Sequence, residues 1–301
     1  MPKLPVSPMK VASLVGEVRE LAHGPSRLLV TGADAEAVEK TRKALSVESW
    51  EDAGPAHAPV KSIVPDGDAG LPREAFSKKV AAVVVVASAE ELTGDEFKGW
   101  FADLSRADKP VVVVLKNPPG IEVSFPGVGP GRVVGMSMDG TPPADLLAKA
   151  VVDAAGDQAA ALAARLPVLR EEACRQIVRR TARQNAVIGC LFIIPGADMP
   201  VMTINEARMV LRLAAAHGED VGAERTLELL GVVGAGFGLR AIARQALVLL
   251  PGPGWIIKGS VAYGGTRAIG RTARIYFDSP RRLTPSRLAP LVEKLKRLRR
   301  R

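Results

Sequence analysis

The residues Val80–Ala87 read VAAVVVVA, an uninterrupted apolar run in which valine is the commonest residue. A short β-branched run of this kind predicts a strand that is buried on both faces of a sheet. Further runs of similar character are Arg27–Thr31, Val60–Val64, Val111–Leu115 and Val133–Met136. Apolar residues at helical spacing predict helices at Asp34–Leu45, Gly94–Arg106 and Pro143–Ala155. Apolar strands that alternate with helices predict an α/β domain with a doubly wound, mostly parallel sheet.

The turn after the first of these strands is where a nucleotide-binding domain of this order holds phosphate. It begins at Gly32, reads GADAEAVE, and is followed by Lys40 and Thr41. The order and spacing of the elements resemble the small GTPase domain of the Era-like type, whose turn has the form G-x-x-x-x-G-K-S/T. In that motif the glycines let backbone N–H groups surround the anion, and the lysine neutralises it. Here the second glycine and the lysine are absent, and Asp34, Glu36 and Glu39 would repel a triphosphate.

The other nucleotide motifs of such domains are eroded in the same way. Where an Asn-Lys-x-Asp would read guanine, the chain has KNPP from Lys116, which supplies no acid for the base. Only Ser137–Gly140 resembles the Ser-Ala loop before the last helix. We therefore expect residues 1–156 to form a degenerate GTPase-like domain that binds no cofactor. Its residual phosphate loop would consist of Thr31, Gly32, Lys40 and Thr41. A different doubly wound domain without GTPase kinship is the alternative.

The distribution of charge and the number of cysteines indicate the cellular compartment and bear on metal binding. The net charge of +9 is concentrated in the second half, where most cations are arginines, while the first half is slightly acidic. Two cysteines, Cys174 and Cys190, and three histidines show neither metal-ligand spacing nor a disulfide framework. Such cysteine usage is typical of a reducing compartment, and the amino terminus lacks the apolar core of a signal peptide. We expect a cytoplasmic protein with no metal site.

The segment Ala186–Gly218 reads AVIGCLFIIPGADMPVMTINEARMVLRLAAAHG, an apolar run, a Pro-Gly break and a long apolar helix. On that helix Asn205, Arg208 and Arg212 share one narrow stripe, so most of its remaining surface is apolar and is expected to be buried in protein or lipid. Asp198 stands at the bend, where a carboxylate can cap the first turn of the helix. The uncharged runs of the second half all fall short of the roughly 18 residues that a membrane-spanning helix needs.

Arginines recur on a later helix, Trp255–Tyr276. Arg267, Arg271 and Arg274 lie on one of its faces, where lipid phosphate, an acidic partner or water can meet them. Pairs of small residues four positions apart predict close helix packing at two places in the second half of the chain. The pairs are Gly234 with Gly238 and Ser260 with Gly264.

The chain ends in a basic amphipathic segment, residues 285–301. One face is rich in leucine, and the opposite face carries Lys294 and Arg297. Such a helix can lie on an anionic leaflet, or dock its leucines on its own domain. Nucleic acid is not expected as a partner, because the aromatic residues of the second half lie in apolar helices and do not alternate with the basic residues of the tail.

The residues Gln184–Phe277 closely resemble the domain of unknown function found in YcjF-like bacterial proteins. The resemblance rests on five blocks in order, which are IPGADMP, RMVLRLAAAHG, GLRAIARQ, PGPG and KGSVAYGGTRAIG. It implies a helical domain that often follows an Era-like GTPase domain, that is commonly membrane-associated, and for which no enzymatic activity is established.

We therefore expect an all-α second domain, residues 157–301, joined to the first by a long helix with the boundary near Gly156. The predicted function is that of a non-catalytic scaffold or regulator at the cytoplasmic side of the bacterial inner membrane. Its expected partner is a membrane surface or anionic lipid, with a protein partner or homo-oligomer as a further option. Two alternatives are a GTP or ATP hydrolase with a non-standard phosphate loop and a soluble helical interaction module. No residue stands out as a nucleophile, general acid or general base.

Overall fold

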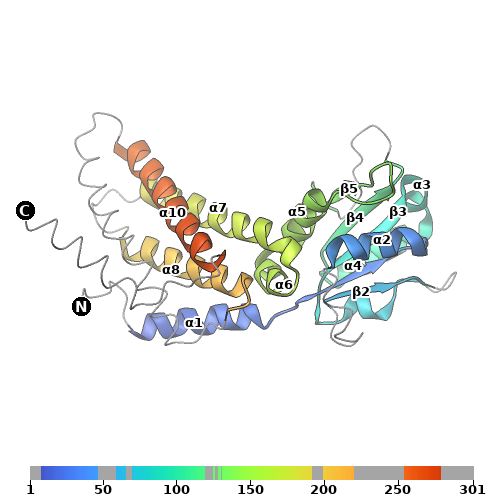
Figure 1. Ribbon diagram of the computed structural model, residues 1–301, viewed down its shortest axis with the longest axis horizontal. Helices are drawn as coiled ribbons and strands as arrows, with labels where there is room; N and C mark the ends of the chain where they lie inside the picture. Colours follow the sequence, from blue (N-terminus) through green and yellow to red (C-terminus); the bar gives the residue numbers. More distant parts are fainter. Residues whose placement is uncertain are drawn as a thin grey trace, which may run out of the picture. The chain divides into compact units, whose positions relative to one another are not determined.

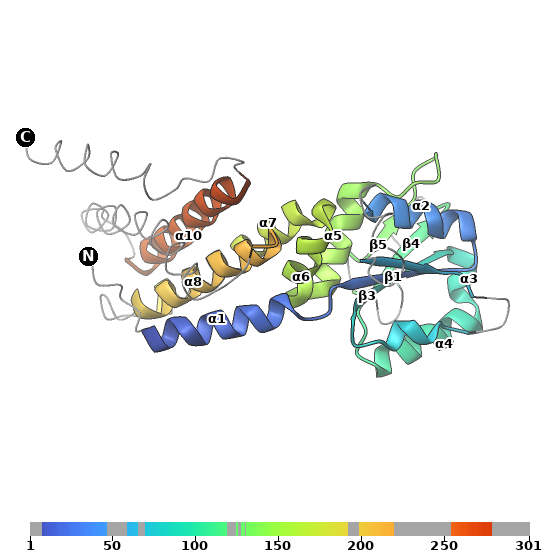
Figure 2. The ribbon, with the colours of Figure 1, turned by 60° about the horizontal axis from the view of Figure 1, so that its bottom comes forward.

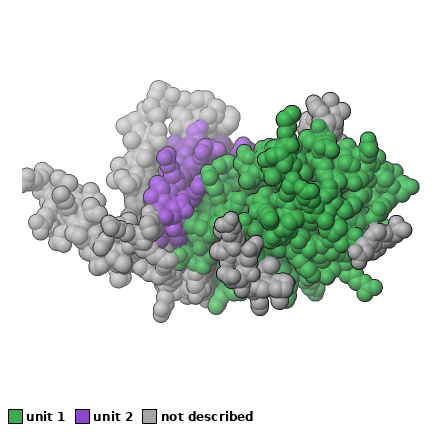
Figure 3. All heavy atoms as spheres, turned by 45° about the vertical axis from the view of Figure 1, so that its right-hand side comes forward, with its two compact units in different colours: residues 1–177, 211–226 green, residues 178–210, 227–301 purple. Residues whose placement is uncertain are grey.

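The structure is a computed structural model, and it describes residues 8–46, 59–65, 70–118, 125, 128–129, 131–191, 199–219 and 254–278. The chain divides into two compact units, which Figure 3 colours separately. Unit 1 comprises residues 1–177 and 211–226, and unit 2 comprises residues 178–210 and 227–301. The expected domain boundary near Gly156 stays a prediction.

Unit 1 contains a five-stranded sheet in the order β2-β1-β3-β4-β5, in which every neighbouring pair is parallel (Figure 1). The strands are β1 (Arg27–Thr31), β2 (Val60–Ile63), β3 (Val80–Ser88), β4 (Val111–Lys116) and β5 (Val133–Gly135). The valine-rich run of β3 lies at the centre, where Val83–Val86 are fully buried. The expected α/β architecture with a parallel sheet is confirmed, and each predicted strand lies within two residues of its expected position.

Helices cover both faces of this sheet. They are α2 (Ala35–Leu45), α3 (Ala89–Thr93), α4 (Asp95–Arg106) and α5 (Ala144–Ala155). On one face Phe97, Trp100 and Leu104 of α4 pack against the buried valines of β3 and β4. Helices α2 and α5 contact the strands from the opposite face, as Figure 2 shows. Unit 1 also contains α1 (Pro8–Ala22) and short 3-10 helices at Arg73–Phe76 and Gly156–Gln158.

The single long helix expected after Ala154 is broken. Helix α5 ends at Gly156, which has a positive φ of 55°, and the chain continues through a 3-10 turn into α6 (Ala159–Arg165) and then α7 (Pro167–Leu191). Leu166 between them is extended, with φ −122° and ψ 90°. Proline disfavours the helical conformation in the residue before it and is itself well suited to the first turn of a helix. The expectation of one continuous helix was therefore wrong, because Pro167 keeps Leu166 out of the helical conformation.

In unit 2 the described residues are helical and come from α7, α8 (Met199–Ala216) and α10 (Gly254–Asp278). Helices α7 and α10 run antiparallel and approach closely at two glycines. Gly259 lies against Cys190, and a Cβ placed on Gly270 would come within 2.5 Å of Val178 Cγ2. The close packing expected at Ser260 and Gly264 was wrong, since no atom of a neighbouring element lies within 4 Å of where a Cβ on Gly264 would be. Both residues are exposed.

Helix α8 is largely buried in the protein, as its apolar surface predicts. Met202, Met209 and Leu213 are at most 2% exposed, whereas Asn205 and Arg208 retain partial exposure. Across the described residues, no helix combines the length and hydropathy required to span a bilayer.

Candidate functional site

The candidate site is a hollow of about 440 Å³ in unit 1, at the carboxyl ends of the strands. Its walls come from the start of α2 and from the chain at and after the carboxyl ends of β4 and β5. Its polar lining residues are Asp34, Glu36, Lys40, Lys116, Asn117 and Ser137. In open parallel sheets, ligands bind at this edge, at the point where the strand order reverses. The order of the present sheet reverses between β1 and β3, next to the hollow.

Asp34 occupies the amino terminus of α2. Its Oδ1 accepts a hydrogen bond from the Ala37 backbone N–H at 3.1 Å and thereby caps the helix. The exposed N–H groups and the helix dipole make this position the natural place for an anion. The Ala37 amide, with help from Lys116 and against partial burial, holds the pKa of Asp34 below its ordinary value. The protein's own carboxylate therefore takes the place of an external anion.

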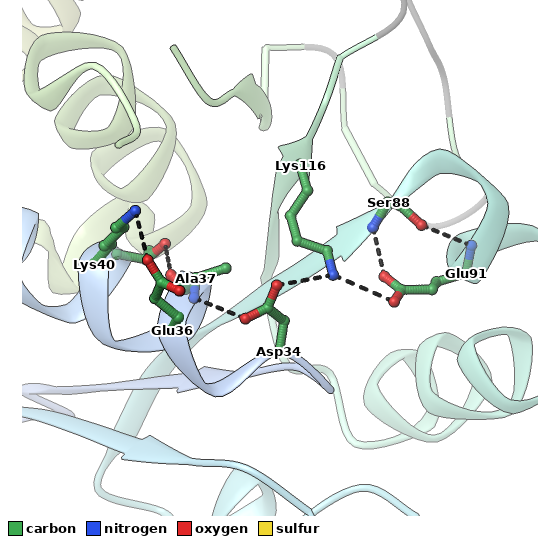
Figure 4. A network of polar contacts seen from close by, with 8 residues as sticks. Asp34, Glu36, Ala37, Lys40, Ser88, Glu91 and Lys116 are labelled. Carbon is green, nitrogen blue, oxygen red and sulfur yellow. Dashed lines mark hydrogen bonds and ion pairs between the residues drawn. The ribbon is translucent and has the colours of Figure 1, made fainter. Parts of the chain in front are cut away.

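Lys116, at the end of β4, connects two acidic residues (Figure 4). Its Nζ donates to Asp34 Oδ2 and to Glu91 Oε1, both at 3.3 Å, and its side chain is only 19% exposed. Glu91 in turn forms a capping box with Ser88, since Glu91 Oε2 accepts from the Ser88 N–H and Ser88 Oγ accepts from the Glu91 N–H. We call Asp34, Lys116 and Glu91 the lysine bridge.

The lysine bridge joins the amino terminus of α2, the helix α3 and the carboxyl end of β4. Burial opposes ionisation of Glu91, but the Ser88 amide and Lys116 outweigh it, so the pKa of Glu91 also lies below its ordinary value. Both acids are thus held ionised around one cation. Such an arrangement stabilises the edge of the sheet, and it leaves Lys116 already engaged by two carboxylates.

The residues of the expected residual phosphate loop do not converge on one point. Thr31 and Thr41 are fully buried, and the Thr41 hydroxyl donates to the Ala37 carbonyl at 2.8 Å. Gly32 packs so closely on the Val86 carbonyl that a Cβ at residue 32 would overlap it. Lys40 pairs with Glu36 at 2.9 Å, which raises the pKa of Lys40. Of these four residues, only Lys40 lines the hollow.

The positions that would read a base are also used internally. Pro118 packs on Gly135, where a Cβ would lie 2.8 Å from the proline ring. Asp139 in the loop after β5 accepts from both the N–H and the hydroxyl of Thr141, at 3.0 and 2.7 Å. These two hydrogen bonds lower the pKa of Asp139 and hold its carboxylate within its own turn.

The candidate interaction residues of the second half fall into different surroundings. In unit 1, Arg212 lies 3.4 Å from Asp157 and 3.9 Å from Glu17. In unit 2, Arg208 donates to Asn205 Oδ1 at 3.4 Å. On α10, Arg267 and Arg271 are exposed, Arg274 is half-buried, and the Arg267 guanidinium lies 5.7 Å from the centre of the Tyr263 ring. The remaining candidates, Asp198, Lys294 and Arg297, lie outside the described residues.

Sequence reasoning missed a buried polar network in unit 2 that joins α7, α8 and α10. Thr266 donates to Glu206 Oε1 at 2.9 Å, and Asn185 donates to Thr266 at 3.0 Å and accepts from Asn205 at 3.0 Å. Asn185 and Thr266 are fully buried, and Glu206 is 1% exposed. The available signal was the single acid, Glu206, of a largely apolar helix, since a buried carboxylate needs polar partners.

Comparison of the chain with protein-family models, with curated proteins and with solved structures finds no match. In the part of the chain that the structure describes, no cluster of three or more His, Cys, Asp or Glu residues is arranged to hold a metal ion.

Proposed function

We propose that this protein is a non-catalytic scaffold or regulator that associates with an anionic membrane. In this proposal residues 1–156 are a GTPase-like domain without a working nucleotide site, and residues 157–301 are a YcjF-like domain that makes the attachment. The absence of a working nucleotide site is supported by the position of Asp34, whose carboxylate caps α2 and is held by Lys116.

A carboxylate that belongs to the chain competes strongly with a free phosphate for the same amides. It loses no translational freedom on binding, because it is covalently attached. A phosphate that displaced it would meet Asp34 and Glu36, which line the same hollow, and Lys116 would have to leave two carboxylates to neutralise it. The covalent attachment of Asp34, the repulsion by the acidic residues and the engagement of Lys116 all favour the state in which Asp34 caps α2 over a state with bound nucleotide.

The proposed membrane association is supported by features of the second half of the chain. The resemblance of Gln184–Phe277 to the YcjF-like domain supports it, as does the concentration of arginine in this half. Basic residues next to apolar surface are the combination that anionic leaflets attract. The proposed location is the cytoplasmic side of the bacterial inner membrane, with a protein partner or a second copy as a further contact.

Calorimetric titration of the purified full chain with GTP and with ATP, each with Mg²⁺, tests the proposal that residues 1–156 have no working nucleotide site. We expect no binding at millimolar nucleotide. A dissociation constant well below about 1 mM, or about 4 kcal/mol of binding free energy, would contradict the proposal and favour a hydrolase with a non-standard loop.

Cell fractionation tests the proposed attachment to an anionic membrane. We expect the protein in the membrane fraction, with release by high salt or carbonate because the attachment is peripheral and electrostatic. Recovery of the whole protein in the soluble fraction, as a defined oligomer on size exclusion without detergent, would instead favour a soluble interaction module.

A further inference from the structure

The described part of unit 2 has an unusually one-sided charge. Its residues 178–191, 199–210 and 254–278 contain eight Lys or Arg and only two acids, Glu206 and Asp278. Glu206 is buried in the network between the helices, so Asp278 is the one acid that the described surface of this unit exposes. A surface of this kind attracts polyanions and repels cationic partners.

Five of the cations lie along one seam, where α7 and α10 meet. Arg179 and Arg183 belong to the stripe of α7 that continues through Ala186 and Cys190 to the contact with Gly259 on α10. On α10, Arg267, Arg271 and Arg274 fall within about 60° of the helix circumference. We call Arg179, Arg183, Arg267, Arg271 and Arg274 the arginine face.

The arginine face lies on the side of the α7–α10 pair that is turned away from α8. Helix α8 meets α7 through the Asn205–Asn185 hydrogen bond and meets α10 through Glu206 and Thr266. On each helix the arginines lie on the other flank of the seam from these contacts, as the helical geometry requires. Figures 1 and 2 show α10 running beside α7.

The arginines of this face are available to a ligand. Four of them are exposed and Arg274 is half-buried, and within the described residues none forms an ion pair. The Arg267 guanidinium lies over the Tyr263 ring, 5.7 Å from its centre. Large apolar side chains are exposed on the same two helices, namely Val187 at 57%, Leu191 at 71% and Ile275 at 59%.

We propose that the arginine face docks on the phosphate groups of an anionic phospholipid bilayer. This inference rests on the proposed membrane association and names the surface that makes it. Arginine suits phosphate because its planar guanidinium donates two parallel hydrogen bonds. Exposed aliphatic side chains beside the cations fit the boundary between headgroups and acyl chains. A single-stranded nucleic acid would need exposed aromatic rings for stacking, and Tyr263 is instead half-buried under Arg267.

Vesicle co-sedimentation of the full chain tests the proposal. The vesicles are phosphatidylcholine alone or phosphatidylcholine mixed with phosphatidylglycerol, at low and high salt. The face variants are R267Q/R271Q and R179Q/R183Q, and the matched control is R73Q/R106Q, which removes the same charge from exposed positions of unit 1. A fourth variant, K294Q/R297Q, removes two cations from the basic tail. Circular dichroism melting checks that each variant is folded.

We expect binding to the anionic vesicles only, weaker at high salt. Each arginine near the leaflet strengthens partitioning roughly fivefold, so each face variant should lower the partition coefficient by about 25-fold. The control should stay within about twofold of the unaltered chain.

Three results would overturn the proposal in distinguishable ways. If K294Q/R297Q abolishes binding and the face variants bind normally, membrane association stands but the arginine face is not its surface. If the unaltered chain binds no vesicle at low salt, the proposed function falls with it. If it ignores vesicles but binds a fluorescent RNA or DNA oligonucleotide, and the face variants lose that binding, the surface serves nucleic acid.

Discussion

Replacing Asp34 separates the two stabilising roles of its carboxylate. Asp34→Ala removes both the α2 cap and the pairing with Lys116, whereas Asp34→Asn keeps a side-chain oxygen for the cap. Loss of a cap costs about 1 kcal/mol, and a partly exposed ion pair contributes about 0.5 kcal/mol. Unfolding free energy should therefore fall by about 1.5 kcal/mol in the alanine variant and by about 0.5 kcal/mol in the asparagine variant.

Urea denaturation measures these differences, with Trp100 as a probe inside the core of unit 1, where it is 4% exposed. The pH dependence supplies a second readout. Because the folded-state pKa of Asp34 is depressed below its ordinary value of 3.8, its ionised form stabilises the fold above that pH. This stabilisation is lost as the pH falls through the lower folded-state pKa. The advantage of the unaltered chain over Asp34→Asn should therefore disappear in strong acid.

The matched control is Asp103→Ala, which removes only an exposed helical pair with Arg106 and should cost at most about 0.5 kcal/mol. Equal stabilities of Asp34→Ala and Asp34→Asn at neutral pH would refute the capping role. A difference between the unaltered chain and Asp34→Asn that persists unchanged in acid would refute the ion pair with Lys116.

Three further predictions can be measured by the same denaturation assay. Gly32→Ala should destabilise unit 1 by about 3 kcal/mol because its Cβ overlaps a backbone carbonyl, whereas Gly16→Ala in open space on α1 should stabilise by about 0.5–1 kcal/mol. On α10, Gly270→Ala should cost about 2 kcal/mol, whereas Gly264→Ala, in open space like Gly16, should stabilise by about 0.5–1 kcal/mol; equal effects of the two α10 substitutions would contradict the described helix contact. Thr266→Val keeps the shape but removes a buried hydroxyl, so it should cost about 1–2 kcal/mol; a neutral result would show that the network adds no stability.

The sheet could be predicted from the sequence because its signal is local. A strand buried on both faces needs consecutive apolar residues, and Val80–Ala87 satisfies this without reference to any other segment. The same holds for α2 and α5, whose apolar residues repeat at helical spacing. The break at Pro167 was also visible locally, since proline restricts the residue before it, but the alanine-rich composition around it favoured a continuous helix.

The candidate site was predicted only in part. The sequence shows that Ala37 and Val38 stand where a phosphate loop beginning at Gly32 needs its second glycine and its lysine, and it excludes a standard loop on that ground. It does not show that Asp34 turns back to cap α2, nor that Lys116, 82 residues further along the chain, reaches it. Likewise, helical spacing groups Arg267 with Arg271 but gives no sign that Arg179 and Arg183 lie along the same seam.

The sequence by itself determined the five strands of the parallel sheet, the helices α2, α4 and α5 and the absence of a standard phosphate motif, because each follows from the identities of neighbouring residues. Only the tertiary structure decided the lysine bridge, the buried network around Glu206 and the arginine face. The physical reason is that charge pairs and hydrogen bonds join groups that are close in space, and which distant segments become neighbours depends on how the elements pack. Asp34 after β1, Glu91 on α3 after β3 and Lys116 at the end of β4 are far apart in the sequence, and they become neighbours only because these three strands lie side by side.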